Sequence, residues 1–589
     1  MAGKPAVLEA PPSRGNMRFG VSFAMSLKRF FLVRLGRVIS YPVRRQLRQF
    51  EVACQTPEVV QSELLRGILH TQRNTAFGRD HSFGAVQTPA DFRKSVPIAP
   101  YEYVAPYIDR VQKGETNALL AAHRVHMFAL TSGTTASRKL IPVTDEYLAA
   151  YRRGWNMWGI KMYRDNRGRR VAMRPIVQMV GDPEEFRTPA GIPCGNLSGY
   201  TAMVQKRLIR WMYAVPHVTG KIKDAKARYY VALRFAIARN VSQFMAANPS
   251  TLVQFARTLD AEKESLLRDL RDGTLRADLD IPPEIRGLLS RKLNRDPKKA
   301  AELGAIAEKT GQLFPTDVWP VEGTVINTWT GGSMGPYLRQ LPRYFGTPPV
   351  RDLGLLASEG RMTIPLESGT PGGVLDIASH YFEFVPEGEI DSPSPTVLGA
   401  HELQLGGSYY ILPTTAYGLY RYHISDLVRV TGFLGRTPIV EFLGKGHRFA
   451  NLTGEKLSEY HVTRAMDTVA QRLLQPITAY SLAPIWDETQ PYYGLFLEET
   501  DATDEVGLKR FLAEFDQQLG DENIEYAAKR EGARLGPVRA LLLPAGTWAA
   551  WDRARLAQTG GSPEQYKHPC LIGDVNFRAT MPVRREVRA

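Results

Sequence analysis

Apolar and polar residues alternate along the chain with two spacings, one typical of helices and one typical of strands. Between Pro57 and His70 the apolar positions recur every three or four residues, which predicts an amphipathic helix. The apolar run from Val125 to Leu130 predicts a strand, and Thr144 can cap a helix that follows it. One face of this helix collects four aromatic residues, namely Tyr147, Tyr151, Trp155 and Trp158. The intervening segment is therefore expected to join a strand directly to a helix.

The rest of the pattern divides into a helical region, a region of short strands and a smaller unit with both. Residues 202–313 are expected to be mainly helical, with breaks at Asn248-Pro249 and at Ile281-Pro282-Pro283. From Gly323 to about Phe433, short apolar runs between glycine-rich turns predict strands. After Gly444 we expect a helix from Ser458 to Leu474, a strand near Leu495 to Leu497 and a helix from about Val506 to Leu519. The pattern predicts an α/β protein.

The length of the chain favours more than one domain. A chain of 589 residues exceeds a single ordinary hydrophobic core. We predict a basic N-terminal segment over residues 1–49, a large domain over residues 50–443 and a smaller C-terminal domain over residues 444–589. The glycine-bearing stretch at residues 444–454 is the predicted hinge between the two domains.

The segment from Thr131 to Lys139, Thr-Ser-Gly-Thr-Thr-Ala-Ser-Arg-Lys, has the composition of a phosphate-binding loop. Gly133 lets the backbone approach a ligand closely, and the hydroxyls of Ser132, Thr134 and Thr135 can donate hydrogen bonds to anionic oxygens. Lys139 adds a positive charge. The Walker A pattern does not fit, because no second glycine precedes the lysine and a leucine follows it. A Ser/Thr-rich surface turn is the alternative interpretation.

Three charged residues far apart in the chain complete a candidate site. Glu359 follows the apolar run that ends in Leu-Leu-Ala-Ser, where it could hold a magnesium ion. Asp426 lies between alternating apolar residues and could accept both hydroxyls of a ribose. Lys567 offers a cation in a loop that Pro569 stiffens. Each also has a simpler interpretation, as a solvated charge or a turn residue.

These segments, in this order, resemble the auxin-responsive (Gretchen Hagen) family of acyl acid amido synthetases, which belongs to the adenylate-forming ligases. The resemblance runs from about Phe50 to the C-terminal region. The matching motifs are Arg66 to Leu69, Asn74 to Gly78, Val96 to Ile98, Pro106 to Ile108, Thr131 to Lys139, Trp329 to Ser333, Ala357 to Glu359, Gly418 to Tyr422 and Gln565 to Lys567. The resemblance implies a large adenylate-forming domain with mixed sheets, helices and a small β-barrel-like part, followed by a mobile α+β domain.

The resemblance also implies a role for each matching residue. The phosphate loop would bind nucleotide through Ser132, Gly133, Thr134, Thr135 and Lys139. Further nucleotide contacts would come from Thr330, Gly331, Gly332, Ser333, Ser358, Glu359, Tyr422 and Asp426. Glu359 would also bind the metal, Asp426 the ribose, and Lys567 would act in catalysis together with Lys139. The segment from Phe442 to Glu459 resembles the hinge of adenylate-forming enzymes.

Some residues depart from the family pattern, and these differences concern the conformation of the loops rather than nucleotide binding. Ala136 and Ser137 stand where the phosphate loop usually carries a further glycine nearby. His423 and Ser425 replace the arginine and glycine of the Tyr-Arg-x-Gly-Asp motif.

The implied activity is the ATP- and Mg²⁺-dependent conversion of a carboxylic acid into an acyl adenylate, followed by transfer to an amine, expected to be an amino acid. One alternative is an acyl-CoA or acyl-carrier ligase, which shares the adenylation step and delivers the acyl group to a thiol. The other alternative is a non-catalytic protein that binds a membrane or nucleic acid through its basic residues.

Net charge leaves these alternatives open, because a formal charge of +15 suits ATP, nucleic acid or anionic lipid. Part of the excess lies in one stretch without acidic residues that contains Lys28, Arg29, Arg34, Arg37, Arg44, Arg45 and Arg48. This stretch could be an amphipathic helix in weak contact with a membrane surface, or a packed helix with solvated arginines. Its apolar runs are too interrupted for a transmembrane helix or a secretory signal, so we expect a cytoplasmic protein.

The three cysteines, Cys54, Cys194 and Cys570, form no C-x-x-C pair, and we therefore expect neither zinc nor disulfides. The expected partners are a small carboxylic acid and an amine, without nucleic acid.

Overall fold

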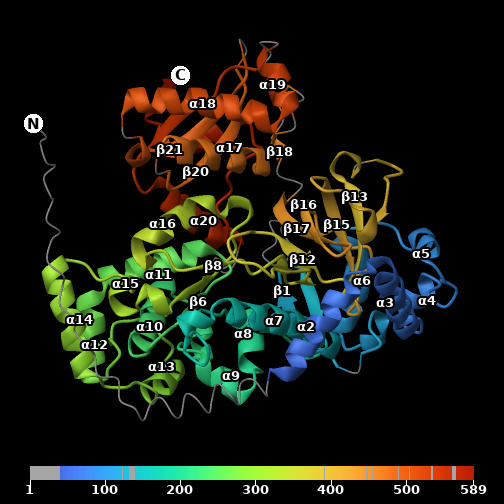
Figure 1. Ribbon diagram of the computed structural model, residues 1–589, viewed down its shortest axis with the longest axis horizontal. Coiled ribbons are helices and arrows are strands. Elements are labelled where there is room, and N and C mark those ends of the chain that lie inside the picture. The colour runs from blue at the N-terminus through green and yellow to red at the C-terminus, as the bar shows by residue number, and fades with distance from the viewer. Residues whose placement is uncertain are drawn as a thin grey trace, which may run out of the picture. The chain divides into compact units, whose positions relative to one another are not determined.

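The computed structural model describes residues 40–589 except 123, 132–138, 391, 446–448, 451, 454, 456, 476, 488–489, 503, 532–534 and 560–565 (Figure 1). The chain forms two compact units, Met1–Pro42 and Val43–Ala589. Of the first unit only Ser40, Tyr41 and Pro42 are described. The predicted basic stretch therefore lies largely outside the described residues.

Among the described residues, five α-helices precede the first sheet: α2 (Tyr41–Ala53), α3 (Pro57–Gln72), α4 (Ala76–Asp80), α5 (Pro89–Ser95) and α6 (Tyr101–Gln112). On α2, Leu47 and Phe50 are buried in the core, whereas Arg45 and Arg48 are exposed. α3 confirms the helix predicted from Pro57 to His70. Its buried Gln61 donates hydrogen bonds to the carbonyl oxygens of Ile377 and His380, at 2.7 and 2.8 Å. These bonds fix α3 to a distant part of the chain.

The first sheet has the order β2-β1-β5-β4, with β1 (Met127–Leu130), β2 (Leu140–Val143), β4 (Phe186–Arg187) and β5 (Pro193–Gly195). β1 and β2 are antiparallel, and the loop of residues 131–139 joins them. The prediction that this loop leads directly into a helix is wrong, because the apolar residues of β2 are buried against β1. Pro142 is tolerated there because β2 is an edge strand. α7 (Asp145–Asp165) starts after β2, with Thr144 as its predicted cap.

A parallel sheet lies at the centre of the helical region, in the order β3-β6-β7-β8. Its strands are β3 (Ile176–Gln178), β6 (Gln243–Met245), β7 (Val325–Asn327) and β8 (Val350–Arg351). Its connections contain α8 (Leu197–Met203), α9 (Arg207–Met212), α10 (Ala225–Ile237), α11 (Pro249–Ala261), α12 (Lys263–Asp272), α13 (Pro283–Ser290), α14 (Pro297–Thr310), α15 (Pro315–Val318) and α16 (Gly335–Phe345). The predicted helical region is confirmed, and α11 starts at the expected break, where Asn248 accepts a hydrogen bond from the Ser250 amide.

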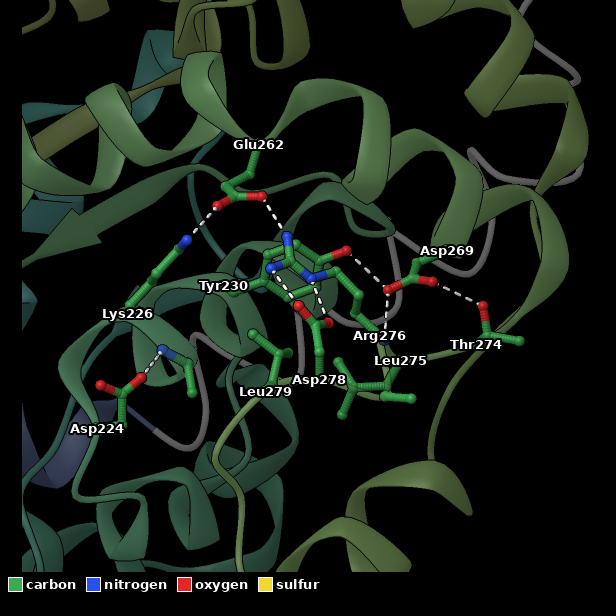
Figure 2. Close-up of polar contacts among 12 residues, drawn as sticks. Asp224, Lys226, Tyr230, Glu262, Asp269, Thr274, Leu275, Arg276, Asp278 and Leu279 are labelled. Carbon is green, nitrogen blue, oxygen red and sulfur yellow. Dashed lines mark hydrogen bonds and ion pairs between the residues drawn. The ribbon is translucent and has the colours of Figure 1, made fainter.

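A polar network joins α10, α12 and the turn after α12 (Figure 2). The buried carboxylate of Asp269 accepts hydrogen bonds from the Tyr230 hydroxyl at 2.7 Å, the Thr274 hydroxyl at 2.8 Å and the Arg276 amide at 2.8 Å. The Arg276 guanidinium pairs with Glu262 and Asp278 and lies over the Tyr230 ring. We call these six residues, Tyr230, Glu262, Asp269, Thr274, Arg276 and Asp278, the Arg276 network.

The largest sheet has seven strands in the order β11-β12-β17-β16-β15-β13-β14. They are β11 (Thr363–Ile364), β12 (Gly373–Leu375), β13 (Tyr381–Pro386), β14 (Leu398–Gly399), β15 (Ser408–Thr414), β16 (Asp426–Leu434) and β17 (Thr437–Lys445), and neighbours are antiparallel. Within the described residues this order has two free ends. The expected barrel-like part is therefore an open sheet. The short hairpin of β9 (Leu356–Ala357) and β10 (Gly360–Arg361) precedes it.

The C-terminal part has its own sheet and its own buried clusters of side chains. Its strands are β18 (Phe449–Ala450), β19 (Leu457–Ser458), β20 (Tyr480–Ile485), β21 (Tyr492–Glu498), β22 (Arg539–Leu543) and β23 (Arg585–Arg588), and the last four form a sheet in that order. Its helices are α17 (Glu459–Arg472), α18 (Glu505–Glu522), α19 (Ile524–Glu531) and α20 (Thr547–Thr559). α17, β21 and α18 confirm the three elements predicted here. The domain boundary and hinge stay predictions.

Candidate nucleotide-binding site

The hairpin of β16 and β17 brings together Asp426 and Lys445. Asp426 is the first residue of β16 and pairs in register with Lys445, the last residue of β17. The Asp426 carboxylate is 3% exposed, and its Oδ1 lies 2.5 Å from the Lys445 ammonium. That ammonium also donates a hydrogen bond to the Ile424 carbonyl oxygen at 2.9 Å. Because a buried carboxylate needs a compensating charge, Lys445 is the local counter-ion of Asp426.

Glu359 lies in the same electrostatic environment. It connects β9 to β10 and is 7% exposed. Burial raises the pKa of Glu359, and the charge of Asp426 acts in the same direction, whereas Lys445 and Lys139 lower it. The four charged residues thus influence one another although they come from three separate parts of the chain.

Lys139 faces the aromatic rings of Tyr101 and Tyr422. Its ammonium lies 5.7 Å from the ring centroid of Tyr101 and 6.0 Å from that of Tyr422. The Tyr101 hydroxyl accepts a hydrogen bond from the Leu140 amide at 2.9 Å, which holds the start of β2. Burial raises the pKa of the Tyr422 hydroxyl, and so do the charges of Glu359 and Asp426. Tyr422 is therefore close to Lys139 and within electrostatic reach of the two carboxylates.

The base of the predicted phosphate loop adjoins Ser358. The Thr131 amide donates to the Lys139 carbonyl oxygen at 3.2 Å and closes the loop. The Ser358 hydroxyl donates to the Leu130 carbonyl oxygen at 2.8 Å, so that Glu359 follows immediately beside the loop. Ser132, Gly133, Thr134 and Thr135 lie outside the described residues, and their role as phosphate ligands stays a prediction.

The Thr330-Gly331-Gly332 segment packs against β17. The Thr330 amide and hydroxyl both donate to Asp352 Oδ2, at 2.6 and 2.7 Å. Gly332 has φ +62°, and a Cβ there would lie 3.3 Å from the Phe442 ring. The positive φ favours glycine at this turn, and a Cβ would also crowd the Phe442 ring. Ser333 follows in a short 3₁₀ helix, Gly332–Met334, but its side chain is outside what the structure describes.

Lys567 comes from the C-terminal part and reaches the same segment. Its ammonium lies 4.4 Å from the ring centroid of Trp329 and 5.1 Å from that of Phe442. The Asn248 side chain donates a hydrogen bond to the carbonyl oxygen of Tyr566, the residue before Lys567. Phe442 lies on β17, the strand that ends in Lys445. The structure thus brings together parts of the chain more than 300 residues apart.

The sequence analysis missed the pairing of Lys445, which it named only as part of the hinge segment. Gly435 and Arg436 form the turn between Leu434 and Thr437. Eight residues away from this turn on each strand, Asp426 on β16 pairs with Lys445 on β17. The two β-bulges in this hairpin cancel, so this count gives the observed partners. The two-residue spacing of the turn was the signal that could have found the pair.

The charged groups suit a nucleotide with magnesium. Mg²⁺ is usually held by one or two carboxylates together with substrate phosphates. Glu359, with Asp426 close enough to raise its pKa, offers such an arrangement. Among the described residues, no group of three or more His, Cys, Asp or Glu side chains is arranged to hold a metal ion. Across the same residues, no helix is long and apolar enough to span a bilayer.

Comparison with known proteins identifies the family. The GH3 family N-terminal domain matches residues 46–350, the central domain residues 373–445 and the C-terminal domain residues 460–576. The chain is 24% identical to jasmonoyl–L-amino acid synthetase JAR6 of Nicotiana attenuata, with 90% of this chain and 93% of that protein covered. It is 23% identical to indole-3-acetic acid-amido synthetase GH3.4 of Arabidopsis thaliana, covering 90% and 91%.

The fold is also that of a solved structure. The GH3.15 acyl acid amido synthetase superposes with a TM-score of 0.77 at 20% identity, covering 91% of this chain and 95% of that chain.

Proposed function

Because the chain belongs to the GH3 family, as its motifs indicated, we propose that it is an ATP-dependent ligase that couples a carboxylic acid to an amine, expected to be an amino acid. The named relatives are a jasmonoyl–L-amino acid synthetase and an indole-3-acetic acid-amido synthetase. The observation that carries the proposal is the meeting of Glu359, Asp426, Lys445 and Lys139 beside the base of the predicted phosphate loop.

In the first step the carboxylate of the acid attacks the α-phosphorus of ATP. A bond forms between the carboxylate oxygen and phosphorus, and the bond to the bridging oxygen breaks, which releases pyrophosphate. Two anions must approach each other, so cations are needed beside the reacting atoms. Lys139 and Lys567 would supply positive charge from the protein. Mg²⁺ bound near Glu359 would neutralise phosphate charge and help to align the phosphates.

Asp426 would accept hydrogen bonds from the two ribose hydroxyls and so direct the α-phosphate toward the acid. For this the ribose has to share or replace the contact that Lys445 makes with the Asp426 carboxylate. Lys445 would then be free to turn toward a phosphate. When no nucleotide is bound, Lys445 would balance the charge of the Asp426 carboxylate. When nucleotide binds, the same carboxylate would accept the hydrogen bonds of the ribose.

In the second step the amine attacks the acyl carbon of the adenylate. The new bond joins nitrogen and carbon, AMP leaves with the bridging oxygen, and the amine loses a proton. Adenylate-forming enzymes of this kind reorient the C-terminal domain between the two steps, which would withdraw Lys567 and admit the amine. The predicted hinge at residues 444–454 includes Lys445, the last residue of β17, and would serve this movement.

The proposal is tested by acid-dependent exchange of labelled pyrophosphate into ATP, measured with a panel of aromatic and aliphatic acids. We expect exchange with some acids, dependent on Mg²⁺ and strongly reduced by Asp426→Ala. Asp574→Ala, which removes an exposed carboxylate of the C-terminal part, is the matched control and should retain exchange. The absence of exchange with every acid would contradict the proposal.

The acceptor is decided by the mass of the product formed with amino acids or with coenzyme A. An amide supports the proposal. A thioester would instead make the chain an acyl-CoA ligase with the same adenylation step. Salt-sensitive binding to lipid or nucleic acid without any ATP turnover would favour the non-catalytic alternative.

A further inference from the structure

Asp552 on α20 binds the two residues that flank Lys567. The Tyr566 hydroxyl donates a hydrogen bond to Asp552 Oδ1 at 2.7 Å. Nδ1 of His568 lies 2.8 Å from the same carboxylate oxygen. One carboxylate thus holds the residue before Lys567 and the residue after it.

The other ring nitrogen of His568 is also fixed. Nε2 lies 3.1 Å from the Tyr480 carbonyl oxygen and 3.1 Å from the Ser481 hydroxyl oxygen. The Ser481 hydroxyl in turn donates its hydrogen to the Pro569 carbonyl oxygen at 2.7 Å. Since that hydroxyl hydrogen is engaged, Nε2 is the donor toward Ser481 and the imidazole is anchored on both sides.

Ser481 contacts His568, and His568 contacts Asp552, as in the catalytic triad of a serine hydrolase. Burial excludes nucleophilic catalysis by this serine. Ser481 is 0% exposed, so no substrate can reach its hydroxyl. The rings of Trp548 and Trp551 lie 4.6 and 5.7 Å from the His568 ring and enclose it further. The arrangement is therefore built to hold the chain in place.

The chain that follows is equally well anchored. The Leu482 amide donates to the Cys570 carbonyl oxygen at 2.8 Å, and the Ile572 amide donates to the Leu482 carbonyl oxygen at 2.8 Å. Glu459 accepts a hydrogen bond from the Cys570 amide at 2.7 Å. Residues 568–572 are thus attached to β20 and α17, and Lys567 is the residue at which the chain leaves this support.

We propose that Asp552 is a positioning residue for Lys567, acting through Tyr566 and His568. In extended chain, side chains two residues apart share a face and the residue between them points the opposite way. Tyr566 and His568 share one face here, because both contact Asp552. Lys567 is thereby presented away from α20, toward Trp329 and Phe442. This inference rests on the proposed function, in which Lys567 acts during adenylation.

The test compares Asp552→Asn and Tyr566→Phe with the control Asp574→Asn in acid-dependent pyrophosphate exchange. Asp552→Asn removes the charge that both neighbours contact, and a small displacement of a catalytic group can cost about 100-fold. We expect its kcat for exchange to fall about 10-fold to 100-fold, with the KM for ATP nearly unchanged. Tyr566→Phe removes one hydrogen bond and should lower kcat about threefold to tenfold. Asp574→Asn should match the wild type.

A double-mutant cycle separates positioning from general damage. If Asp552 acts through Lys567, then Asp552→Asn causes no further loss in a Lys567→Ala enzyme. An equal loss in both backgrounds, or a rise in KM without a change in kcat, would overturn the inference. If Asp552→Asn does not fold, Tyr566→Phe carries the same cycle.

The outcomes also separate this inference from the function on which it rests. A wild type without exchange refutes the proposed function and this inference with it. Wild-type kinetics of Lys567→Ala refute the role of Lys567, and therefore also the inference, but leave the adenylation chemistry standing. A slow Lys567→Ala enzyme beside a normal Asp552→Asn enzyme overturns the inference alone.

Discussion

The Arg276 network and the candidate nucleotide site use the same types of side chain in opposite ways. In the network the Asp269 carboxylate, 2% exposed, accepts three hydrogen bonds from Tyr230, Thr274 and the Arg276 amide (Figure 2). The hydrogen bonds of Asp278 and the charges of Glu262 and Asp278 raise the pKa of the Arg276 guanidinium further. Every charge has a partner within the network, which therefore holds two helices and a turn together.

At the nucleotide site the carboxylates are less well matched. Burial raises the pKa of Glu359, which means that its surroundings disfavour the ionised form. Asp426 has a counter-ion, but the ammonium of Lys445 stands at the end of a strand on a flexible side chain. Buried carboxylates that lack matched donors destabilise a fold, and such groups are typical of sites that a ligand completes. The comparison thus distinguishes a structural network from a binding site.

The largest expected effect is on catalysis at the nucleotide site. Lys567→Ala should slow acid-dependent pyrophosphate exchange by about 100-fold to 1,000-fold, the loss typical for one group that stabilises transition-state charge. The thermal unfolding temperature should change little, because Lys567 is only partly buried and a cation–π contact at such a site contributes about 1 kcal/mol. Wild-type exchange kinetics in this variant would contradict the role of the lysine.

The next largest effect is on stability in the Arg276 network. Asp269→Ala leaves a hydroxyl of Tyr230, a hydroxyl of Thr274 and the Arg276 amide without their acceptor, and should cost about 3 kcal/mol of unfolding free energy. The measurement is urea denaturation, with Asp272→Ala as the control. Asp272 is an exposed acid on the same helix, and its loss should cost much less than the loss of Asp269. If Asp269→Ala and Asp272→Ala lower the unfolding free energy equally, the Arg276 network stabilises the fold no more than an exposed ion pair does.

Asp426→Ala should weaken nucleotide binding with little loss of stability. Hydrogen bonds to a charged acceptor contribute about 1.5–3 kcal/mol, which corresponds to a rise of about 10-fold to 100-fold in the KM for ATP. The kinetics of exchange at varied ATP concentration measure this change. If the variant instead loses stability as Asp269→Ala does and keeps its KM, Asp426 belongs with the structural carboxylates.

The smallest expected effect is that of Glu359→Gln, which should increase stability rather than decrease it. The raised pKa of Glu359 means that the protonated form is favoured in the folded protein, and this contribution to stability is complete below pH 4.5 and is lost as the pH rises through the folded-state pKa. At neutral pH, Glu359→Gln should therefore stabilise the protein, by about 0.5–2 kcal/mol, the range of typical stabilising substitutions.

The pH dependence sharpens this prediction. The gain in unfolding temperature should shrink as the pH falls and disappear below pH 4.5, where the wild-type carboxyl is also neutral. A variant that is less stable than the wild type at neutral pH would show that Glu359 is structurally matched after all.

Helices and strands could be predicted from the sequence where the apolar residues of a segment keep a single regular spacing. The helix from Pro57 was predicted from apolar periodicity, and the helix after Thr144 from its aromatic face and its capping residue. β2 was missed because Leu140 to Val143 is a run of only four residues, too short for its periodicity to distinguish it from the start of a helix. The pairing with β1, which gives these residues a buried face, is a contact that no local pattern records.

The sequence by itself determined the family and the candidate residues, because the order of the motifs is written along the chain and each motif has a composition suited to its chemistry. Only the tertiary structure decided which charges meet. It paired Asp426 with Lys445 and placed Asp552 against both neighbours of Lys567. The physical reason is that such pairs depend on strand register and on the burial of distant segments against each other. Both arise when the whole chain packs.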